Sequence, residues 1–196
     1  MKILQLMLFC LFVYGCQPKQ KGVLAVPTIP QKYVLKSAPE FTSSNDTLLW
    51  KGQKYSGFVY EVSQNGKDTL LVEGYYEGLQ SGLCQRWYTR KQVREIRHYR
   101  EGKKEGLQVG YWENGRKRFE FMAQNGEYEG ELKEWSSNGH LYHLATYLHG
   151  HEEGPQKMWY DNGKIRANYV IVQGKRYGLL GTKNCKNVSD SIFVVK

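Results

Sequence analysis

The sequence predicts an all-β fold, an elongated antiparallel sheet built from consecutive β-hairpin repeats of 24 residues. Three observations predict it, and all share this period. Two glycine series run four residues apart, and Asn-Gly pairs and one aromatic residue per unit keep the same spacing. These residues are Gly78, Gly102, Gly126, Gly150 and Gly174; Gly82, Gly106, Gly130, Gly154 and Gly178; Asn114-Gly115, Asn138-Gly139 and Asn162-Gly163; and Trp87, Tyr111, Trp135 and Trp159.

The glycines predict where the chain reverses. Asn-Gly between two strand-like runs favours a tight type I′ turn, which needs positive φ at both central residues. The Gly-x-x-x-Gly junctions would supply a second, looser reversal. Valine at Gly139 or Gly163 should therefore destabilise the array, whereas Gly110, outside the periodic series, should matter less. Arg90-Lys91 replaces the Asn-Gly pair in one unit, so that hairpin should be less tightly specified.

The second strand of each unit alternates in polarity. Leu141, His143, Ala145 and Tyr147 occupy every other position of one such strand. Residues two apart on a strand share a face, so this pattern predicts a sheet with one buried face. Each hairpin would be stabilised mainly by its neighbours along the array.

These motifs resemble a known repeat. The pattern Gly-x-x-x-x-Trp-Tyr-x-x-Asn-Gly, closed by Tyr-x-x-Gly-x-x-x-Gly, is similar to the bacterial variant of the MORN (membrane occupation and recognition nexus) repeat. Its clearest copies lie at residues 106–115 and 154–163, and the resemblance covers about residues 47–181. That variant is labelled the YwqK family of antitoxin-like proteins. The resemblance implies an architecture rather than an activity, because the motif consists of turn formers and core aromatics.

The N-terminus has the pattern of a lipoprotein signal peptide, predicted over residues 1–15. Lys2 precedes an apolar run too short to span a bilayer, which ends at a lipobox-like Val13-Tyr14-Gly15-Cys16. Cys16 would then carry the lipid and anchor the protein to a membrane. The alternative is an ordinary signal peptide with a chance cysteine. Because Gln17 is not an aspartate, known sorting rules favour an outer-membrane lipoprotein, facing the periplasm.

Three further segments follow the signal peptide. Residues 16–46 contain four prolines and little periodicity, and are predicted to form the lipid anchor and an extended tether. Residues 47–181 form the repeat domain, whose first repeat is degenerate, and residues 182–196 form a C-terminal cap. Cys84 and Cys185 lie about four repeats apart. They are either two isolated thiols or a disulfide that closes the array in an oxidising compartment.

No catalytic motif is present, so the sequence predicts no enzyme and no cofactor. His140, His143, His149 and His151 lie close together, and imidazole is a common metal ligand. Two of them fall on predicted turns, where any polar residue would serve. A solvated hairpin is the preferred interpretation over a metal site.

The charge is unevenly distributed in a chain of net charge +9. Eleven Lys or Arg lie between residues 86 and 118 against four Glu, and six Glu lie between residues 127 and 153 against one Lys. The basic stretch suggests an acidic envelope protein or anionic lipid as partner, since a periplasmic protein rarely meets nucleic acid. The alternative is a charged face that serves solubility alone. The candidate binding residues are Arg94, Arg97, Arg100, Trp87, Tyr111, Trp135 and Trp159.

Three Asp-Ser/Thr-apolar triplets resemble an O-glycosylation acceptor of bacterial periplasmic proteins. They would place sugars on Thr47, Thr69 and Ser191, although strand edges also favour such triplets. Taken together, the sequence predicts a non-catalytic, lipid-anchored envelope protein that acts as a protein-binding scaffold. The alternative, which follows from the family label, is an antitoxin-like or immunity protein that neutralises a partner toxin.

Overall fold

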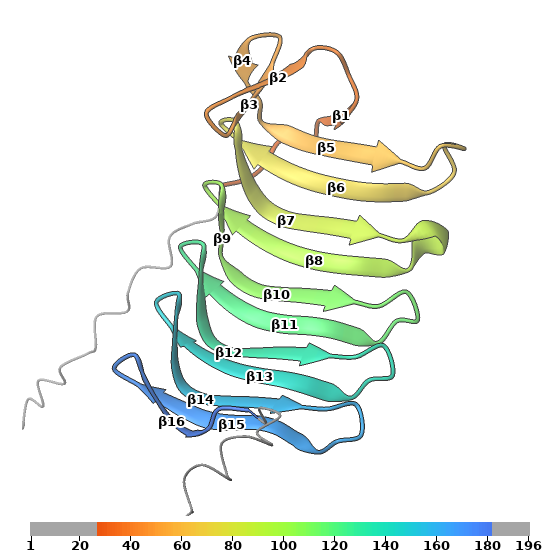
Figure 1. Cartoon of the computed structure of the whole chain (residues 1–196). Helices are drawn as coiled ribbons and strands as arrows, with labels where there is room; N and C mark the ends of the chain where they lie inside the picture. The colour runs from red at the N-terminus through yellow and green to blue at the C-terminus, as the bar shows by residue number, and fades with distance from the viewer. Residues whose placement is uncertain (1–26, 182–196) are drawn as a thin grey trace, which may run out of the picture.

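The computed structural model describes residues 27–181. The predicted signal peptide, the predicted lipidation site Cys16, the predicted C-terminal cap, Cys185 and Ser191 lie outside these residues. Two sheets make up the described part: a 13-stranded sheet in the order β1-β5-β6-β7-β8-β10 through β16, with β9 paired to β8, and a small sheet β2-β3-β4 (Figure 1). All pairs are antiparallel except β1 with β5, which confirms the predicted fold class.

The strands follow the chain as successive hairpins, and Figure 1 shows them stacked into one elongated ribbon. Their bounds are β1 Tyr33–Leu35, β2 Phe41–Ser44, β3 Thr47–Trp50, β4 Gln53–Lys54, β5 Gly57–Val62, β6 Thr69–Tyr76, β7 Leu79–Trp87, β8 Val93–Arg100, β9 Lys103–Lys104, β10 Gly106–Tyr111, β11 Lys117–Gln124, β12 Glu127–Trp135, β13 Leu141–Leu148, β14 His151–Trp159, β15 Ile165–Val172 and β16 Lys175–Leu179. One 3-10 turn, η1 (Thr89–Lys91), joins β7 to β8.

Folded structure begins earlier than the boundary expected at residue 47. β1 and β2 both lie within the segment predicted as a tether, and β1 pairs in parallel with β5, Tyr33 opposite Phe58. Tyr55 is buried here, and its hydroxyl donates to the carbonyls of Lys32 and Phe58 at 3.0 and 3.1 Å. The three-residue strand between prolines carries too short a pattern to be recognised in the sequence.

The two kinds of turn are interchanged relative to the prediction. Type I′ geometry, with positive φ at both central residues, occurs at the first glycine series, as at Glu101-Gly102 (φ 49° and 80°). At Asn114-Gly115 only the glycine has positive φ, at 82°. The Gly115 amide donates to the Trp112 carbonyl at 2.9 Å. This is a type I turn followed by a left-handed glycine, so the expectation of a type I′ turn at Asn-Gly is wrong.

The second glycine series lies inside strands rather than in a loose loop. Gly130 in β12 has φ 73°, and the pairing of β11 with β12 shifts register opposite it, between Phe121 and Met122. Gly82 in β7 and Gly154 in β14 repeat this arrangement, with φ 72° and 82°. A glycine with positive φ is what a β-bulge of this kind requires, and the bulge bends the strand.

Glutamates that precede the bulge glycines hold the next turn in place. Glu105 Oε2 accepts a hydrogen bond from the Asn125 amide at 2.9 Å, and Glu129 Oε2 accepts one from the His149 amide at 2.9 Å. Glu153 makes the same contact one repeat later. A carboxylate that accepts from backbone N–H is a charge-assisted bond, so part of the acidic stretch at residues 127–153 is structural.

Most of the buried residues lie on one face of the sheet, here called the core face, and the alternate residues lie on the outer face. The largest buried cluster on the core face consists of Phe119, Phe121, Ala123, Leu132 and Ala145, with Tyr147 packed against it. The predicted alternation in β13 is confirmed there. Gly110 also lies on this face, and a Cβ added to it would be 2.2 Å from Cε1 of Phe119. The expectation that Gly110 matters little is therefore wrong.

Lys91 occupies the position that Gly115 takes one repeat later, and it has a φ of 63°. A left-handed conformation costs an L-residue about 1–2 kcal/mol, whereas glycine loses about 0.5–1 kcal/mol through its unfolded-state entropy. We expect Lys91→Gly to raise the free energy of unfolding by about 0.5–1 kcal/mol, measured by urea denaturation. Lys103→Gly, in a β-strand, should lower it. A loss of stability in Lys91→Gly would contradict the assignment.

Candidate functional site

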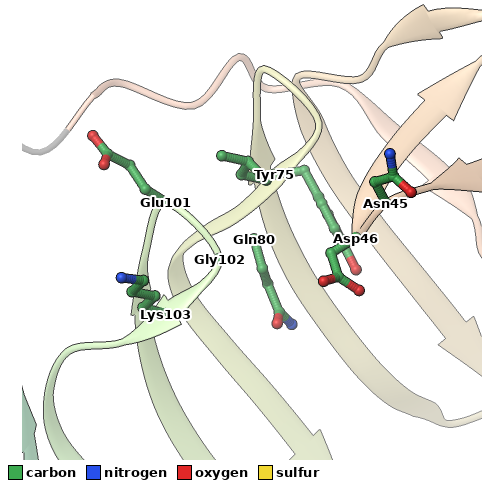
Figure 2. Close-up of a pocket in the computed structure, with 8 residues that line it drawn as sticks. Asn45, Asp46, Tyr75, Gln80, Glu101, Gly102 and Lys103 are labelled. Carbon is green, nitrogen blue, oxygen red and sulfur yellow. The ribbon is translucent and has the colours of Figure 1, made fainter. Parts of the chain in front are cut away.

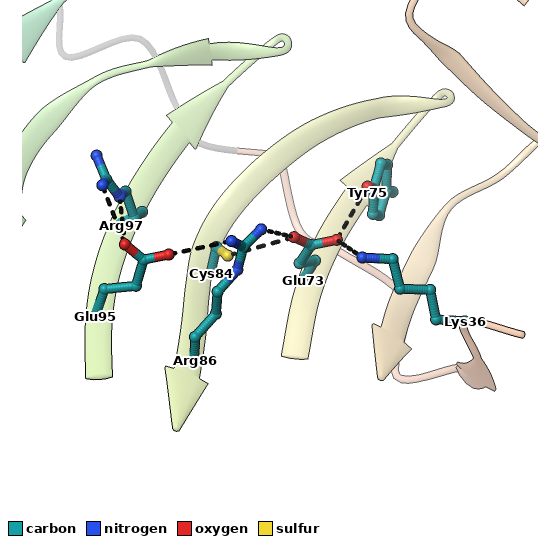
Figure 3. Close-up of polar contacts among 7 residues, drawn as sticks. All are labelled: Lys36, Glu73, Tyr75, Cys84, Arg86, Glu95 and Arg97. Atoms are coloured by element: carbon teal, nitrogen blue, oxygen red, sulfur yellow. Dashed lines mark hydrogen bonds and ion pairs between the residues drawn. The ribbon is translucent and has the colours of Figure 1, made fainter. Parts of the chain in front are cut away.

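A chain of ion pairs crosses three neighbouring strands, β6, β7 and β8, on the core face (Figure 3). Arg86 lies at its centre, with Nη2 3.0 Å from Glu73 Oε1 and Nη1 3.2 Å from Glu95 Oε1. Glu73 and Glu95 are only 4% and 7% exposed. Carboxylates so deeply buried need a paired cation, so this network supports the fold.

Arg97, one of the predicted binding residues, belongs to the same network. Its Nη2 and Nε donate to Glu95 Oε2 at 3.0 and 3.2 Å, and its guanidinium lies 4.8 Å from the ring centre of Phe119. The side chain is 18% exposed. The geometry therefore places Arg97 in an intramolecular contact on the core face, away from the other two predicted arginines.

Cys84 lies beside this network. Its thiol, 2% exposed, donates to Glu73 Oε1 at 3.8 Å. Burial raises the pKa of the Cys84 thiol to about 12, and the Glu73 carboxylate adds to the effect. Burial also raises the pKa of Tyr75, whose hydroxyl donates to Glu73 Oε2 at 3.3 Å. A protonated, buried thiol of this kind is a structural donor and a poor nucleophile.

The raised pKa of Cys84 predicts a loss of stability at alkaline pH. An unfolded chain ionises this thiol above about pH 9, whereas the folded chain keeps it protonated to about pH 12. Its contribution is therefore complete below pH 9 and falls between pH 9 and 12, at up to about 1.4 kcal/mol per pH unit. Cys84→Ser keeps a hydrogen-bond donor without this titration. Urea unfolding near pH 8.5 and 10.5 should show a smaller loss in the variant; equal losses would contradict the prediction.

The predicted aromatic series lies at the joins between repeats. Trp87, Tyr111, Trp135 and Trp159 are all half-buried. The carbonyl of Tyr111 accepts from the Tyr88 hydroxyl at 3.1 Å, and the carbonyl of Trp135 accepts from Trp112 Nε1 at 2.8 Å. Each bond joins one repeat to the next. The side chains that make these joints are Tyr88 and Trp112, whereas Tyr111 and Trp135 contribute main-chain carbonyls.

A row of arginines on the outer face emerges from the structure. Arg94 lies over the Tyr88 ring at 5.8 Å, and Arg118, exactly one repeat later, lies over the Trp112 ring at 5.7 Å. The equivalent position in the next repeat is Tyr142, and in the repeat after that it is Arg166. Within residues 27–181, no ion pair joins any of these three arginines to a carboxylate. We call Arg94, Arg118 and Arg166 the arginine row.

The arginine row could have been found from the sequence, because its members share the repeat spacing. The excess of basic residues in the sequence instead favoured Arg94, Arg97 and Arg100, which all lie on one strand, β8. Arg94 and Arg100 do share the outer face, as alternation predicts. Cation–π contact with Tyr88 or Trp112 holds a guanidinium in place while leaving its donors available, which suits recognition of a carboxylate.

The histidines make pairwise contacts. His143 Nδ1 lies 2.8 Å from Glu134 Oε2, and His149 Nδ1 lies 3.5 Å from Glu129 Oε2. The described residues contain no group of three His, Cys, Asp or Glu side chains that could hold a metal ion.

A hollow of about 540 Å³ lies between the small sheet and the turn after β8 (Figure 2). The Asn45-Asp46 turn faces Glu101, Gly102 and Lys103 across it, with Gln80 between them. Its lining combines Leu79 and Tyr75 with polar side chains of both charges.

Two of the three possible glycosylation sites can be placed. Thr47 is the first residue of β3 and follows Asp46. It is half-buried, and its hydroxyl donates to the Asn45 carbonyl at 3.4 Å. The Cγ2 methyl group of Thr47 lies 2.4 Å from the position that a Cβ at Gly78 would occupy. Thr69 is exposed at the start of β6. Of these two positions, Thr69 is the more accessible acceptor.

Comparison with known proteins identifies the repeat. A family model described as a MORN repeat variant matches residues 128–149 and 152–169. These residues cover most of β12 to β15, and the unmatched hairpins before them repeat the same turns. MORN repeats are typically found in repeat proteins that bind proteins or membranes. No curated protein matches the chain. Among residues 27–181, no helix is long and apolar enough to cross a membrane.

Proposed function

We propose that this chain is a non-catalytic scaffold of the bacterial envelope, anchored by lipid at Cys16 to the outer membrane and facing the periplasm, that binds another envelope protein. The arginine row carries the proposal. It presents guanidinium groups on the outer face, two of which, those of Arg94 and Arg118, lie over aromatic rings. No carboxylate is paired to any of the three within the described residues. A MORN repeat, which commonly binds proteins or membranes, supports a role in binding.

The spacing of the row defines the partner's chemistry. Arg94 in β8 and Arg118 in β11 are two strands apart in the sheet, a separation of about 9.5 Å. Guanidinium groups recognise carboxylates through paired hydrogen bonds. The partner should therefore present acidic side chains along an extended surface. Because an exposed ion pair contributes only about 0–1 kcal/mol, several members of the row must act together.

Charge reversal of the whole row tests the proposal. We expect Arg94→Glu/Arg118→Glu/Arg166→Glu to reduce crosslinked capture of the partner from intact envelopes at least ten-fold. Lys51→Glu/Lys103→Glu/Lys175→Glu changes the net charge equally at exposed positions near the type I′ turns and should retain capture. Raising the salt concentration to about 0.5 M should weaken capture by the unchanged protein, because the Debye length then falls below about 5 Å. Equal capture by both triple variants would refute the role of the arginine row.

A further inference from the structure

The Asn45-Asp46 turn differs from the other type I′ turns. Within residues 27–181, glycine is the second central residue at six of these turns: Lys51-Gly52, Glu77-Gly78, Glu101-Gly102, Asn125-Gly126, His149-Gly150 and Gln173-Gly174. The seventh has Asp46 at that position, with φ 61°. An L-residue is strained in this conformation and glycine is not. The chain therefore keeps a carboxylate where glycine would give a less strained turn, and such strain is typical of functional sites.

The Asp46 side chain lines the hollow of about 540 Å³ between the small sheet and the turn after β8. In Figure 2 its carboxylate and the Gln80 amide extend into the space between these two walls. Across the described part of the chain, neither side chain makes a hydrogen bond or an ion pair with another residue. No contact inside the protein accounts for the strained Asp46, so the geometry points to a ligand.

The opposite wall offers a main-chain donor. Ser81 takes the position of Glu105, the first of the glutamates that hold the next turn in place, and its hydroxyl donates instead to the Leu79 carbonyl at 3.2 Å. The Glu101 amide therefore lacks the carboxylate that the Asn125 amide receives one repeat later. Among the described residues, the N–H of Glu101 has no acceptor.

Both walls of the hollow are held in place by main-chain hydrogen bonds. The Leu48 amide donates to the Gly78 carbonyl at 2.8 Å and joins the small sheet to the stack. The Gly102 amide donates to the Gln80 carbonyl at 2.8 Å and fixes the turn after β8. A site formed in advance loses little conformational entropy on binding. Its volume falls within the range of about 300–1,000 Å³ that is typical of small-molecule sites.

We propose that this hollow binds a neutral sugar. A hydroxyl both donates and accepts, so a sugar can donate to the Asp46 carboxylate and accept from the Gln80 amide or the Glu101 N–H. The half-buried Tyr75 ring supplies an apolar surface for the C–H groups of the sugar. The lining carries two carboxylates, Asp46 and Glu101, and the ammonium of Lys103, so it opposes a ligand with a large charge of either sign.

Amide NMR of the full chain tests the proposal, with cellobiose, maltose and N,N′-diacetylchitobiose as neutral probes. We expect at least one of them to shift the amide signals of Glu101 and Gly102. Asp46→Gly should weaken that binding at least ten-fold, because a carboxylate that accepts hydrogen bonds is lost. The same variant should unfold at an equal or higher urea concentration, because its turn gains the glycine of the other six. Asp161→Gly removes an exposed carboxylate from the turn after β14 and should bind the sugar like the unchanged protein.

Each other outcome would overturn the proposal. Absence of shifts with all three sugars would show that the hollow takes no neutral sugar. Stronger binding of butylammonium or acetate, measured in the same way, would assign the hollow to a charged side chain of a protein partner. Undiminished sugar binding by Asp46→Gly would place the sugar elsewhere, and a lower urea midpoint would give the carboxylate a structural role. Because sugar binding is measured without the envelope partner, the result does not depend on the arginine row.

Discussion

Replacing Arg86 with Met is expected to lower the free energy of unfolding by about 3–5 kcal/mol. Arg86 is the cation shared by Glu73 and Glu95, which are almost completely buried. Without it, the remaining cationic partner of Glu73 is Lys36, at 4.0 Å and half exposed, and that of Glu95 is Arg97. Two buried carboxylates would lose their strongest compensation while keeping the cost of desolvation. Urea denaturation at neutral pH measures the difference.

Two controls separate buried charge from lost packing. Arg94→Met removes an arginine from the outer face of the neighbouring strand and should change stability by no more than about 0.5 kcal/mol. Glu73→Gln/Arg86→Met/Glu95→Gln removes the charges together and should regain most of the loss, because no carboxylate is then left unpaired. A loss below about 1 kcal/mol in Arg86→Met would show that the network behaves like an exposed ion pair.

The repeat architecture was predictable because three independent residue patterns share one period. The turn types were not. Except where Lys91 replaces it, both turns in each unit contain a glycine with positive φ, and they differ in the residue before it. Asn125 adopts positive φ in a type I′ turn, whereas Asn114 does not. The two turn types differ in loop length, that is, in the number of residues between the last hydrogen-bonded pair of the two strands. Loop length depends on the register of the strands and not on the Asn-Gly pair itself.

The candidate binding residues were predictable only in part, for a similar reason. A count of charges along the chain does not say which face of the sheet each one occupies. Glu73 and Arg86 are 13 residues apart and meet only because β6 pairs with β7. That pairing turns part of the basic stretch into a buried network and leaves Arg94 on the outer face. The hollow beside Asp46 also depends on tertiary packing, since it lies between the small sheet and the turn after β8.

Gly110→Val is expected to lower the free energy of unfolding by about 2–3 kcal/mol. Gly110 lies opposite Phe119 across β10 and β11, and the phenyl ring covers the glycine. A Cβ there would be 2.2, 2.5 and 2.8 Å from three ring atoms, so the ring must move. Phe119 also packs against Phe121 and carries the Arg97 guanidinium, so the displacement would disturb the core cluster and the ion network together.

Gly163→Val provides the matched comparison, because it separates steric overlap from backbone strain. Gly163 has φ 78°, and a Cβ there would meet no atom within 4 Å, so valine should cost about 1–2 kcal/mol through conformation alone. Adding Phe119→Leu should recover part of the loss in Gly110→Val, since a smaller side chain leaves room. The same addition to Gly163→Val should only sum the two costs. Urea denaturation of the wild type, the two single variants and the double variant measures the coupling between residues 110 and 119. If their effects on the free energy of unfolding simply add, the contact with Phe119 does not explain why glycine is needed at position 110.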